Sequence, residues 1–185
     1  MIGWIALGVG IFVGLVVLMA LYYYNRFITL ENRIDNSSSQ IDVQLRKRAE
    51  LVPNLVKVVK GYAKHEKGIM EDITKSRKAL LSAGNIQDKV KAGDVMQNAL
   101  RSIFALAENY PTLTADKNFL HLQEELSAIE DKIAYARQYY NDSVMDYENA
   151  SEQFPGVMFF KLYGRKKKDY LHIPESHRAV PEIDL

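Results

Sequence analysis

An uncharged apolar stretch near the N-terminus constrains the fold of this chain more than any other feature. Between Ile2 and Tyr24 there is no Asp, Glu, Lys or Arg. As an α-helix this stretch would be about 35 Å long, whereas the hydrocarbon core of a bilayer is about 30 Å thick. Trp4 lies near one end and three tyrosines lie at the other, where amphipathic rings prefer the headgroup level. The sequence therefore predicts a transmembrane helix over residues 2–24.

A cleavable signal peptide is the alternative for this stretch. Signal peptides begin with basic residues, have a shorter apolar core and end at a site that resembles A-x-A. No Lys or Arg precedes the apolar run here, the run is longer than such a core, and no A-x-A-like site closes it. An uncleaved anchor is the better interpretation.

Basic residues follow the apolar stretch and none precede it. The first are Arg26 and Arg33, and Arg46, Lys47 and Arg48 come next. Because cytoplasmic flanks of transmembrane helices are enriched in Lys and Arg, the N-terminus is expected outside and the body in the cytoplasm.

Small residues lie four apart within the predicted anchor, at Ala6, Gly10 and Gly14. Residues at this spacing share one helix face and let a second helix approach closely. The pattern predicts a homo-oligomer formed in the lipid bilayer, although Gly is also common in transmembrane helices in general.

The body of the chain reads as helical throughout. An apolar stripe in steps of three and four runs from Phe27 to Leu80 and predicts one long helix over 26–82, kinked at Pro53 rather than reversed there. A split into two helices at Pro53 is the alternative. Gly84 is placed to act as its C-cap. Further helices are predicted over 86–108 and 116–152, with a loop at 109–114.

These elements define the expected fold class, an all-α protein with an elongated up-and-down antiparallel helical bundle or coiled coil behind a single transmembrane helix. We expect an anchor at 1–24, a cytoplasmic bundle at 25–152, and an aromatic and basic tail at 153–185 with a disordered end. A helix over 26–82 would be about 85 Å long and would outreach its neighbours. The apolar stripe of residues 26–50 then needs another cover, and a second copy of the chain is the expected one.

Composition excludes several classes of function. The 24 Lys and Arg and 23 Asp and Glu give a net charge of +1, so attraction to nucleic acid is not indicated. The absence of cysteine excludes a disulfide framework and thiolate chemistry. His65-Glu66 is not followed by the second His of a zincin, since residue 69 is Ile. We expect no catalytic residues, no cofactor and no metal.

Several segments of the body carry a recognisable family pattern. The longest is NSSSQIDVQLRKRAELVPNLV at 36–56, followed by VVKGYAKHE at 58–66. Further segments are AENYP at 107–111, NFLHLQEEL at 118–126, and IAYARQYYN at 133–141 leading to Phe154-Pro155. Over residues 22–171 the chain closely resembles the LemA family of bacterial membrane proteins. The resemblance implies a single N-terminal transmembrane segment, a cytoplasmic helical bundle and a bacterial cell membrane, and it transfers no catalytic residue.

Polar residues within these segments are candidates for an interaction site. They are Asn54, Arg137, Tyr140 and Asn141, which combine hydrogen-bonding capacity with positions beside the apolar stripe. The alternative role is hydrogen bonding between helices that fixes their register.

The tail combines aromatic and basic residues. Its candidate membrane-surface residues are Phe159, Phe160, Arg165, Lys166, Lys167 and Lys168. Such a cluster suits an anionic membrane surface. Alternatively, the aromatic residues pack back on the bundle and the basic run is solvated.

Two functional hypotheses follow. The first is a non-enzymatic, membrane-anchored scaffold that self-associates through its anchor and first helix and shapes or organises the membrane. The second is an accessory protein whose cytoplasmic bundle binds an unidentified signalling or protease partner.

Overall fold

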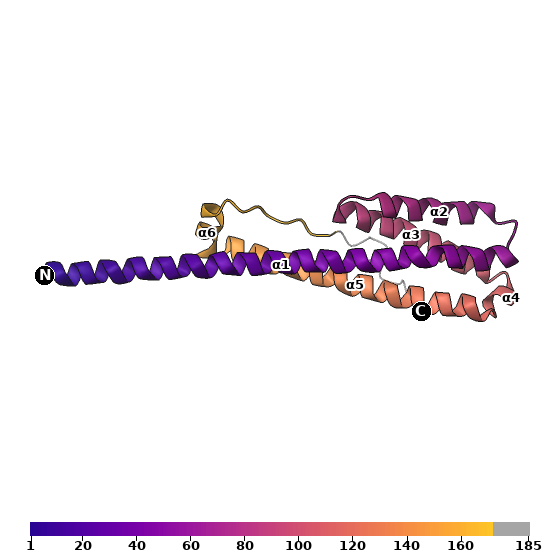
Figure 1. Cartoon of the computed structure of the whole chain (residues 1–185), viewed down its shortest axis with the longest axis horizontal. Coiled ribbons are helices and arrows are strands. Elements are labelled where there is room, and N and C mark those ends of the chain that lie inside the picture. Colours follow the sequence, from indigo (N-terminus) through magenta and orange to yellow (C-terminus); the bar gives the residue numbers. More distant parts are fainter. Residues whose placement is uncertain (172–185) are drawn as a thin grey trace, which may run out of the picture. The chain divides into compact units, whose positions relative to one another are not determined.

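Helices make up nearly all of the structure, a computed structural model that describes residues 1–171. No strand occurs among these residues, which confirms the all-helical prediction. The elements in chain order are as follows: α1 Ile2–Tyr62, α2 Lys67–Ser82, α3 Ile86–Ala107, α4 Pro111–Thr114, α5 Lys117–Glu152 and α6 Gly156–Leu162 (Figure 1). The predicted disordered end of the tail lies outside the described residues.

Two compact units divide the described chain. Unit 1 consists of residues 1–37 and 139–170, and unit 2 consists of residues 38–138 together with Leu171. Helices α1 and α5 contribute residues to both units. The domain boundaries predicted at 24 and 152 rest on other criteria and stay predictions.

The prediction of one long helix over 26–82 is wrong at its C-terminal end. Helix α1 includes Pro53 and continues to Tyr62, where residues 63–66 separate it from α2. The apolar phase continues across this break, because Ala63, Met70 and Ile73 are all buried. The apolar residues of α1 and α2 keep one helical periodicity across residues 63–66, so periodicity alone did not show where α1 ends.

The ends of α2 and α3 show how local sequence sets their limits. Helix α2 ends at Ser82 with Ala83 in an extended conformation, and Gly84 does not adopt the positive φ of a glycine C-cap, so that prediction is wrong. Asn85 caps α3, since its Oδ1 accepts a hydrogen bond of 2.8 Å from the backbone N–H of Asp88. The predicted helix over 86–108 is confirmed to within one residue.

Around α5, one predicted helix is confirmed and two short ones were missed. The carboxylate of Asp116 accepts from the backbone N–H groups of Asn118 and Phe119 and so caps α5, predicted over 116–152. The expected loop at 109–114 contains α4, with Pro111 in its first turn, where a missing N–H costs nothing. The aromatic and basic tail, for which no helix was predicted, contains α6.

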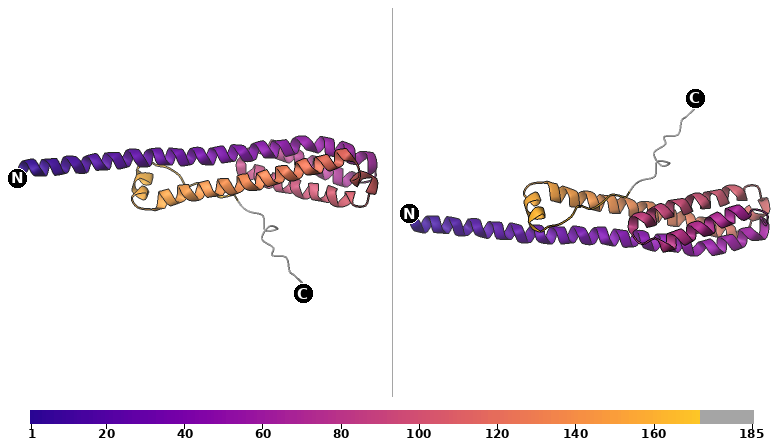
Figure 2. Two further views of the ribbon diagram at one scale, coloured as in Figure 1. Left: turned by 90° about the horizontal axis from the view of Figure 1, so that it is seen from below. Right: turned by 90° about the horizontal axis from the view of Figure 1, so that it is seen from above.

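In unit 2, α2 and α3 pack against each other, and the segments of α1 and α5 lie alongside them in both views of Figure 2. Gly93 of α3 permits a close approach to α1, because a Cβ atom there would lie 2.6 Å from Cδ2 of the buried Leu45. Gly93 lowers the helix propensity of α3, but it allows α3 to pack closely against α1.

The apolar stripe of residues 26–50 is covered within the chain. Phe27, Leu30 and Ile34 are buried in unit 1, and Ile41 and Leu45 are buried in unit 2. The expectation that a second copy must cover this stripe is therefore wrong. Residues of α3, α5 and α6 contribute to this cover, which the sequence did not reveal.

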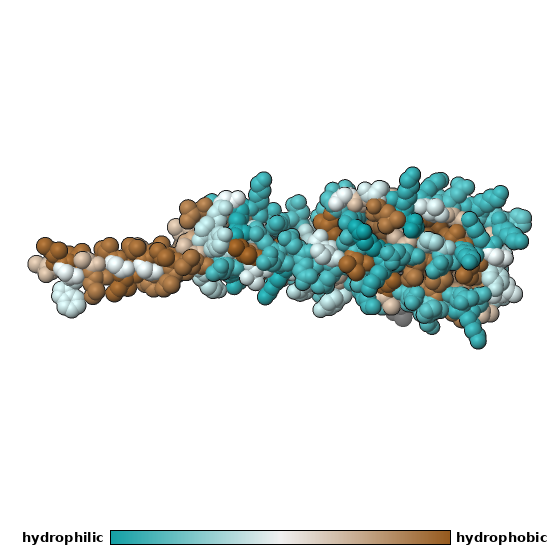
Figure 3. All heavy atoms as spheres, viewed as in Figure 1, coloured by the Kyte–Doolittle hydropathy of each residue, from teal (hydrophilic) through white to brown (hydrophobic). Residues whose placement is uncertain are grey.

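The N-terminal part of α1 is different, because its apolar side chains are uncovered (Figure 3). No part of its most apolar window is buried, and by length and composition this helix is the one among the described residues that could cross a membrane. Trp4 is 80% exposed and Phe12 is 67% exposed.

Candidate functional site

Helix α6 brings a group of aromatic side chains against α1 in unit 1. The ring of Phe159 stacks on Tyr23 with centroids 5.4 Å apart. Phe160 packs edge-on against Phe27 and Tyr147, with centroids 5.6 and 5.9 Å away. Such offset and edge-on contacts add to the stabilisation that burial provides. We call these five residues the aromatic cluster.

Gly156 allows α6 to approach so closely. A Cβ atom at this position would lie 2.1 Å from the backbone oxygen of Ala150 and 3.0 Å from Cε1 of Tyr23. Tyr163, directly after α6, donates a hydrogen bond of 2.6 Å to the backbone oxygen of Ala20. Ala20 lies within the predicted anchor, so α6 reaches the last turns of the apolar segment.

A half-buried ionic group lies beside the aromatic cluster. Glu31 pairs with Arg165 and accepts a hydrogen bond of 2.9 Å from the Tyr147 hydroxyl. The Arg165 guanidinium also lies over the rings of Tyr24 and Phe27, 5.6 and 5.7 Å from their centroids. This arrangement ties the segment after α6 to α1.

The pKa values of this group follow from its surroundings. Burial raises the pKa of Glu31, but hydrogen bonds from Arg165 and Tyr147 outweigh it, so the pKa is lowered from 4.5. Burial and the hydrogen bond to Glu31 raise the pKa of Tyr147. Glu31 is therefore charged and Tyr147 is neutral at neutral pH.

The structure places the predicted membrane-surface residues of the tail in two groups. Phe159, Phe160 and Arg165 contact α1 as described above. Lys166 and Lys167 are exposed and Lys168 is half-buried; Lys167 pairs with Glu152 at 2.5 Å. Contact of the tail with a membrane stays a prediction.

Unit 2 contains a buried arginine that sequence reasoning assigned only to the charged flank of the anchor. Arg48 is 1% exposed and pairs with Glu130 of α5, and its Nη1 donates to the backbone oxygen of Gly93 at 3.3 Å. Burial, with a smaller effect of the nearby Arg137, lowers the pKa of Arg48 to about 10, so it stays protonated at neutral pH. Arg48 lies three residues after the buried Leu45, and this spacing on one helix face was the sequence signal for the burial of Arg48.

The four polar candidates fall in two units. Arg137 pairs with Asp94 of α3 at 2.6 Å in unit 2, and Asn54 is exposed in the same unit. In unit 1 the buried Tyr140 donates to the backbone oxygen of Asp169 at 3.2 Å, and Asn141 is half-buried. Arg137 and Tyr140 therefore have partners within the fold, and a role of the four residues in an interaction site stays a prediction.

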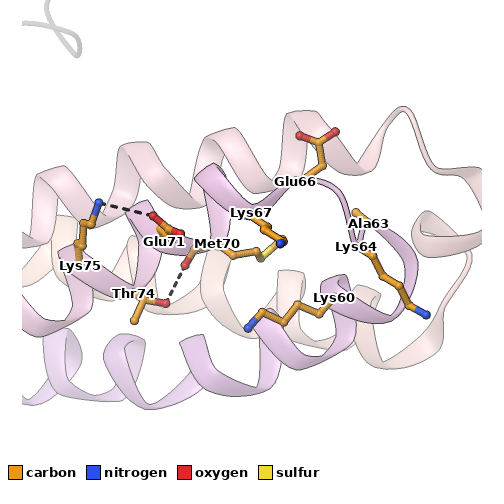
Figure 4. Close-up of a pocket in the computed structure, with 9 residues that line it drawn as sticks. All are labelled: Lys60, Ala63, Lys64, Glu66, Lys67, Met70, Glu71, Thr74 and Lys75. Carbon is orange, nitrogen blue, oxygen red and sulfur yellow. Dashed lines mark hydrogen bonds and ion pairs between the residues drawn. The ribbon is translucent and has the colours of Figure 1, made fainter.

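A cavity of about 620 Å³ lies where α1 turns into α2. It is lined by an apolar floor and a basic rim, whose residues include Ala63, Met70, Lys60, Lys64 and Lys67 (Figure 4). Glu71 and Lys75 on its wall pair at 3.9 Å. The cavity is open, and its chemistry suits a ligand that carries apolar and acidic groups.

The small-residue face of the predicted anchor is exposed. Ala6, Gly10 and Gly14 are exposed, and a Cβ atom at either glycine would meet nothing within 4 Å.

Among residues 1–171 there is no group of three or more His, Cys, Asp or Glu side chains placed to hold a metal. The absence of catalytic, cofactor and metal sites stays a prediction.

Fold and site together define an all-helical protein with one long apolar N-terminal helix and a body held by buried aromatic and ionic contacts. The model of the LemA family matches residues 37–185. This match covers most of the chain, so the protein belongs to the LemA family, as the sequence pattern predicted.

The chain is also similar in sequence to magnetosome proteins, at lower than 30% identity. The chain is 26% identical over 175 residues to the magnetosome protein MamQ of Magnetospirillum gryphiswaldense. It is 24% identical over 173 residues to the magnetosome protein MamQ 2 of Paramagnetospirillum magneticum. Both alignments cover 80% of this chain, and the chain spans 64% of the length of these curated relatives.

Proposed function

We propose that this protein is a single-pass membrane protein that serves as a non-enzymatic scaffold. Residues 2–24 cross the bilayer with the N-terminus outside, and an antiparallel helical bundle extends into the bacterial cytoplasm. The observation that carries this proposal is the uncovered apolar surface of α1, where Phe12 is 67% exposed within an uncharged run long enough to span lipid.

Two other interpretations of such a helix fit less well. A core helix of a soluble protein would be mostly buried, whereas no part of this window is buried. A signal sequence would be removed, yet Tyr163 bonds to Ala20 and Phe159 stacks on Tyr23. Cleavage after the apolar segment would take away these partners of α6.

The proposed orientation gains support from the packing of α6. The basic residues from Arg165 to Lys168 follow the helix that contacts residues 20–27, so they add to the positive charge of Arg26 and Arg33 at the same end of the anchor. A larger excess of positive charge at this end favours its cytoplasmic placement.

A scaffold role is supported by what the body is made of. The buried Arg48 pairs with the half-buried Glu130, and the half-buried Arg137 pairs with Asp94, so these charged groups connect helices. The similarity to magnetosome proteins favours a component of a cellular structure over an enzyme.

Self-association is proposed through the anchor alone, because the stripe of residues 26–50 is covered within the chain. The variant Gly10→Leu with Gly14→Leu closes the small-residue face. In mild detergent we expect the native chain to form a discrete homo-oligomer by light scattering and this variant to be monomeric. Val9→Leu with Val13→Leu, on exposed positions one residue earlier, is the control and should stay oligomeric. A monomeric native chain would contradict scaffolding by self-association.

The second candidate function is the accessory protein, and the cavity between α1 and α2 favours it. Its lysine rim and apolar floor suit an acidic, amphipathic segment of a cytoplasmic partner. Under this function, Lys60→Glu with Lys64→Glu should abolish proximity labelling of one specific partner, whereas Lys57→Glu, outside the cavity lining, should leave it. If the labelled proteins are the same in all three chains, the cavity is not a partner site.

A further inference from the structure

The side of α6 that faces away from α1 carries large apolar residues. Met158 and Leu162, one turn apart on the helix, are 62% and 73% exposed, and Phe154 in the turn before it is 80% exposed. The opposite side of α6 is covered, because Phe159 and Phe160 belong to the aromatic cluster. We call Phe154, Met158 and Leu162 the apolar edge.

The contacts of α6 fix its height along α1. Tyr163 bonds to the backbone oxygen of Ala20, and Ala20 precedes the first charged side chain, Arg26, by six residues. At a rise of 1.5 Å per residue this is about 9 Å on the apolar side of Arg26. Amphipathic helices that lie on membranes bury their apolar faces about 5–10 Å into the boundary between headgroups and acyl chains. Helix α6 therefore lies at the depth of that boundary.

Basic residues lie within α6 and directly after it in sequence; Arg165 pairs with Glu31 and Lys167 with Glu152. Lys161 within α6 is exposed, and Arg165, Lys166, Lys167 and Lys168 follow it. Cations beside an apolar helix face suit the anionic headgroups of a lipid surface. The exposed apolar edge is thus accompanied in sequence by exposed basic residues, Lys161 and Lys166, which favour anionic lipid.

From this height, exposure and charge we infer that α6 is an interfacial helix, which lies on the cytoplasmic leaflet with Phe154, Met158 and Leu162 inserted among the lipids. The inference rests on the proposed membrane anchor and adds a second lipid contact to it. Because α6 is docked on α1 and α5, this contact fixes how deeply the anchor sits and how the helices of unit 1 leave the membrane.

The chain offers a clean test because it contains no cysteine. A single cysteine is introduced at one position and labelled with an environment-sensitive fluorophore, and the full chain is reconstituted in vesicles of phosphatidylglycerol and phosphatidylethanolamine. Quenching by lipids with spin labels on their acyl chains reports contact with lipid. The probe is Met158→Cys; Phe12→Cys reports the anchor, and Val95→Cys, 59% exposed on α3, is the matched apolar control.

We expect the Phe12→Cys and Met158→Cys labels to be quenched and the Val95→Cys label to stay unquenched. If Met158→Cys behaves like Val95→Cys while Phe12→Cys is quenched, the interfacial helix is overturned and the anchor stands. If Phe12→Cys is also unquenched, the anchor itself fails. A Met158→Cys label that lipid does not quench but that is shielded from aqueous iodide means that a protein surface, such as a second copy, covers α6, which also overturns the inference.

Discussion

At the scale of single residues, we expect loss of the Arg48–Glu130 ion pair to reduce the free energy of unfolding most. Glu130→Ala leaves the 1%-exposed Arg48 with a buried, uncompensated charge. Because Glu130 is 30% exposed, we expect a loss of about 2–3 kcal/mol, somewhat below the usual cost of breaking a buried pair. Thermal unfolding of the full chain in detergent, followed by circular dichroism, measures this loss.

A double variant distinguishes loss of the ion pair from the cost of leaving one buried charge unpaired. Arg48→Met with Glu130→Leu removes both charges and keeps apolar volume, so it should recover much of the stability that Glu130→Ala loses. If the double variant is as unstable as the single one, the ion pair is not what the helices of unit 2 require at this position.

Glu31 should make the attachment of α6 to α1 depend on pH. Its pKa is lowered below 4.5 in the folded chain, so its contribution to stability is complete above about pH 4.5 and is lost as the pH falls through the lowered value. Glu31→Gln should be less stable at neutral pH and should lose less on acidification than the native chain. Thermal midpoints recorded from pH 7 to pH 3 check this, and parallel curves for the two chains would contradict it.

At the scale of elements, the docking of α6 depends on a residue without a side chain. Gly156→Ala places a methyl group against the Ala150 backbone and Tyr23, so we expect α6 to loosen. Hydrogen exchange over residues 156–164 should become faster while α2 and α3 keep their protection.

Gly61→Ala in α1 is the matched control for this prediction. A Cβ atom at Gly61 meets nothing within 4 Å, so the alanine should be neutral or should stabilise the helix by up to about 1 kcal/mol. Equal exchange in the Gly156→Ala variant and the native chain would show that α6 does not need this close approach.

The elements that sequence reasoning found are those that local patterns define. Helix α3 begins at an Asn cap and α5 is preceded by an Asp cap, and each carries a long apolar stripe, so their limits were predicted closely. Helix α6 was missed because it has only seven residues and its partners on α1, such as Tyr23 and Phe27, lie more than 130 residues away in sequence. The cover of Phe27 and the burial of Arg48 were missed for the same reason, since both depend on contacts between distant segments.

At the scale of the whole molecule, residues 2–24 carry no charged side chain and every charged side chain of the sequence follows them. The first charged side chain is Arg26, and the basic residues after α6 return to the same end of the anchor. This distribution of charge predicts one orientation in the membrane. Membership of the LemA family was predicted from the motif segments and is confirmed, whereas the orientation rests on charge alone.

Cysteine accessibility in intact bacterial cells tests the central claim most directly. Ile2→Cys and Val95→Cys are each the only thiol in their chain, because the native sequence has none. A membrane-impermeant maleimide should label Ile2→Cys in intact cells and Val95→Cys only after permeabilisation. Labelling of Val95→Cys in intact cells, or of neither residue until the cells are opened, would contradict an anchor that crosses the membrane with its body in the cytoplasm.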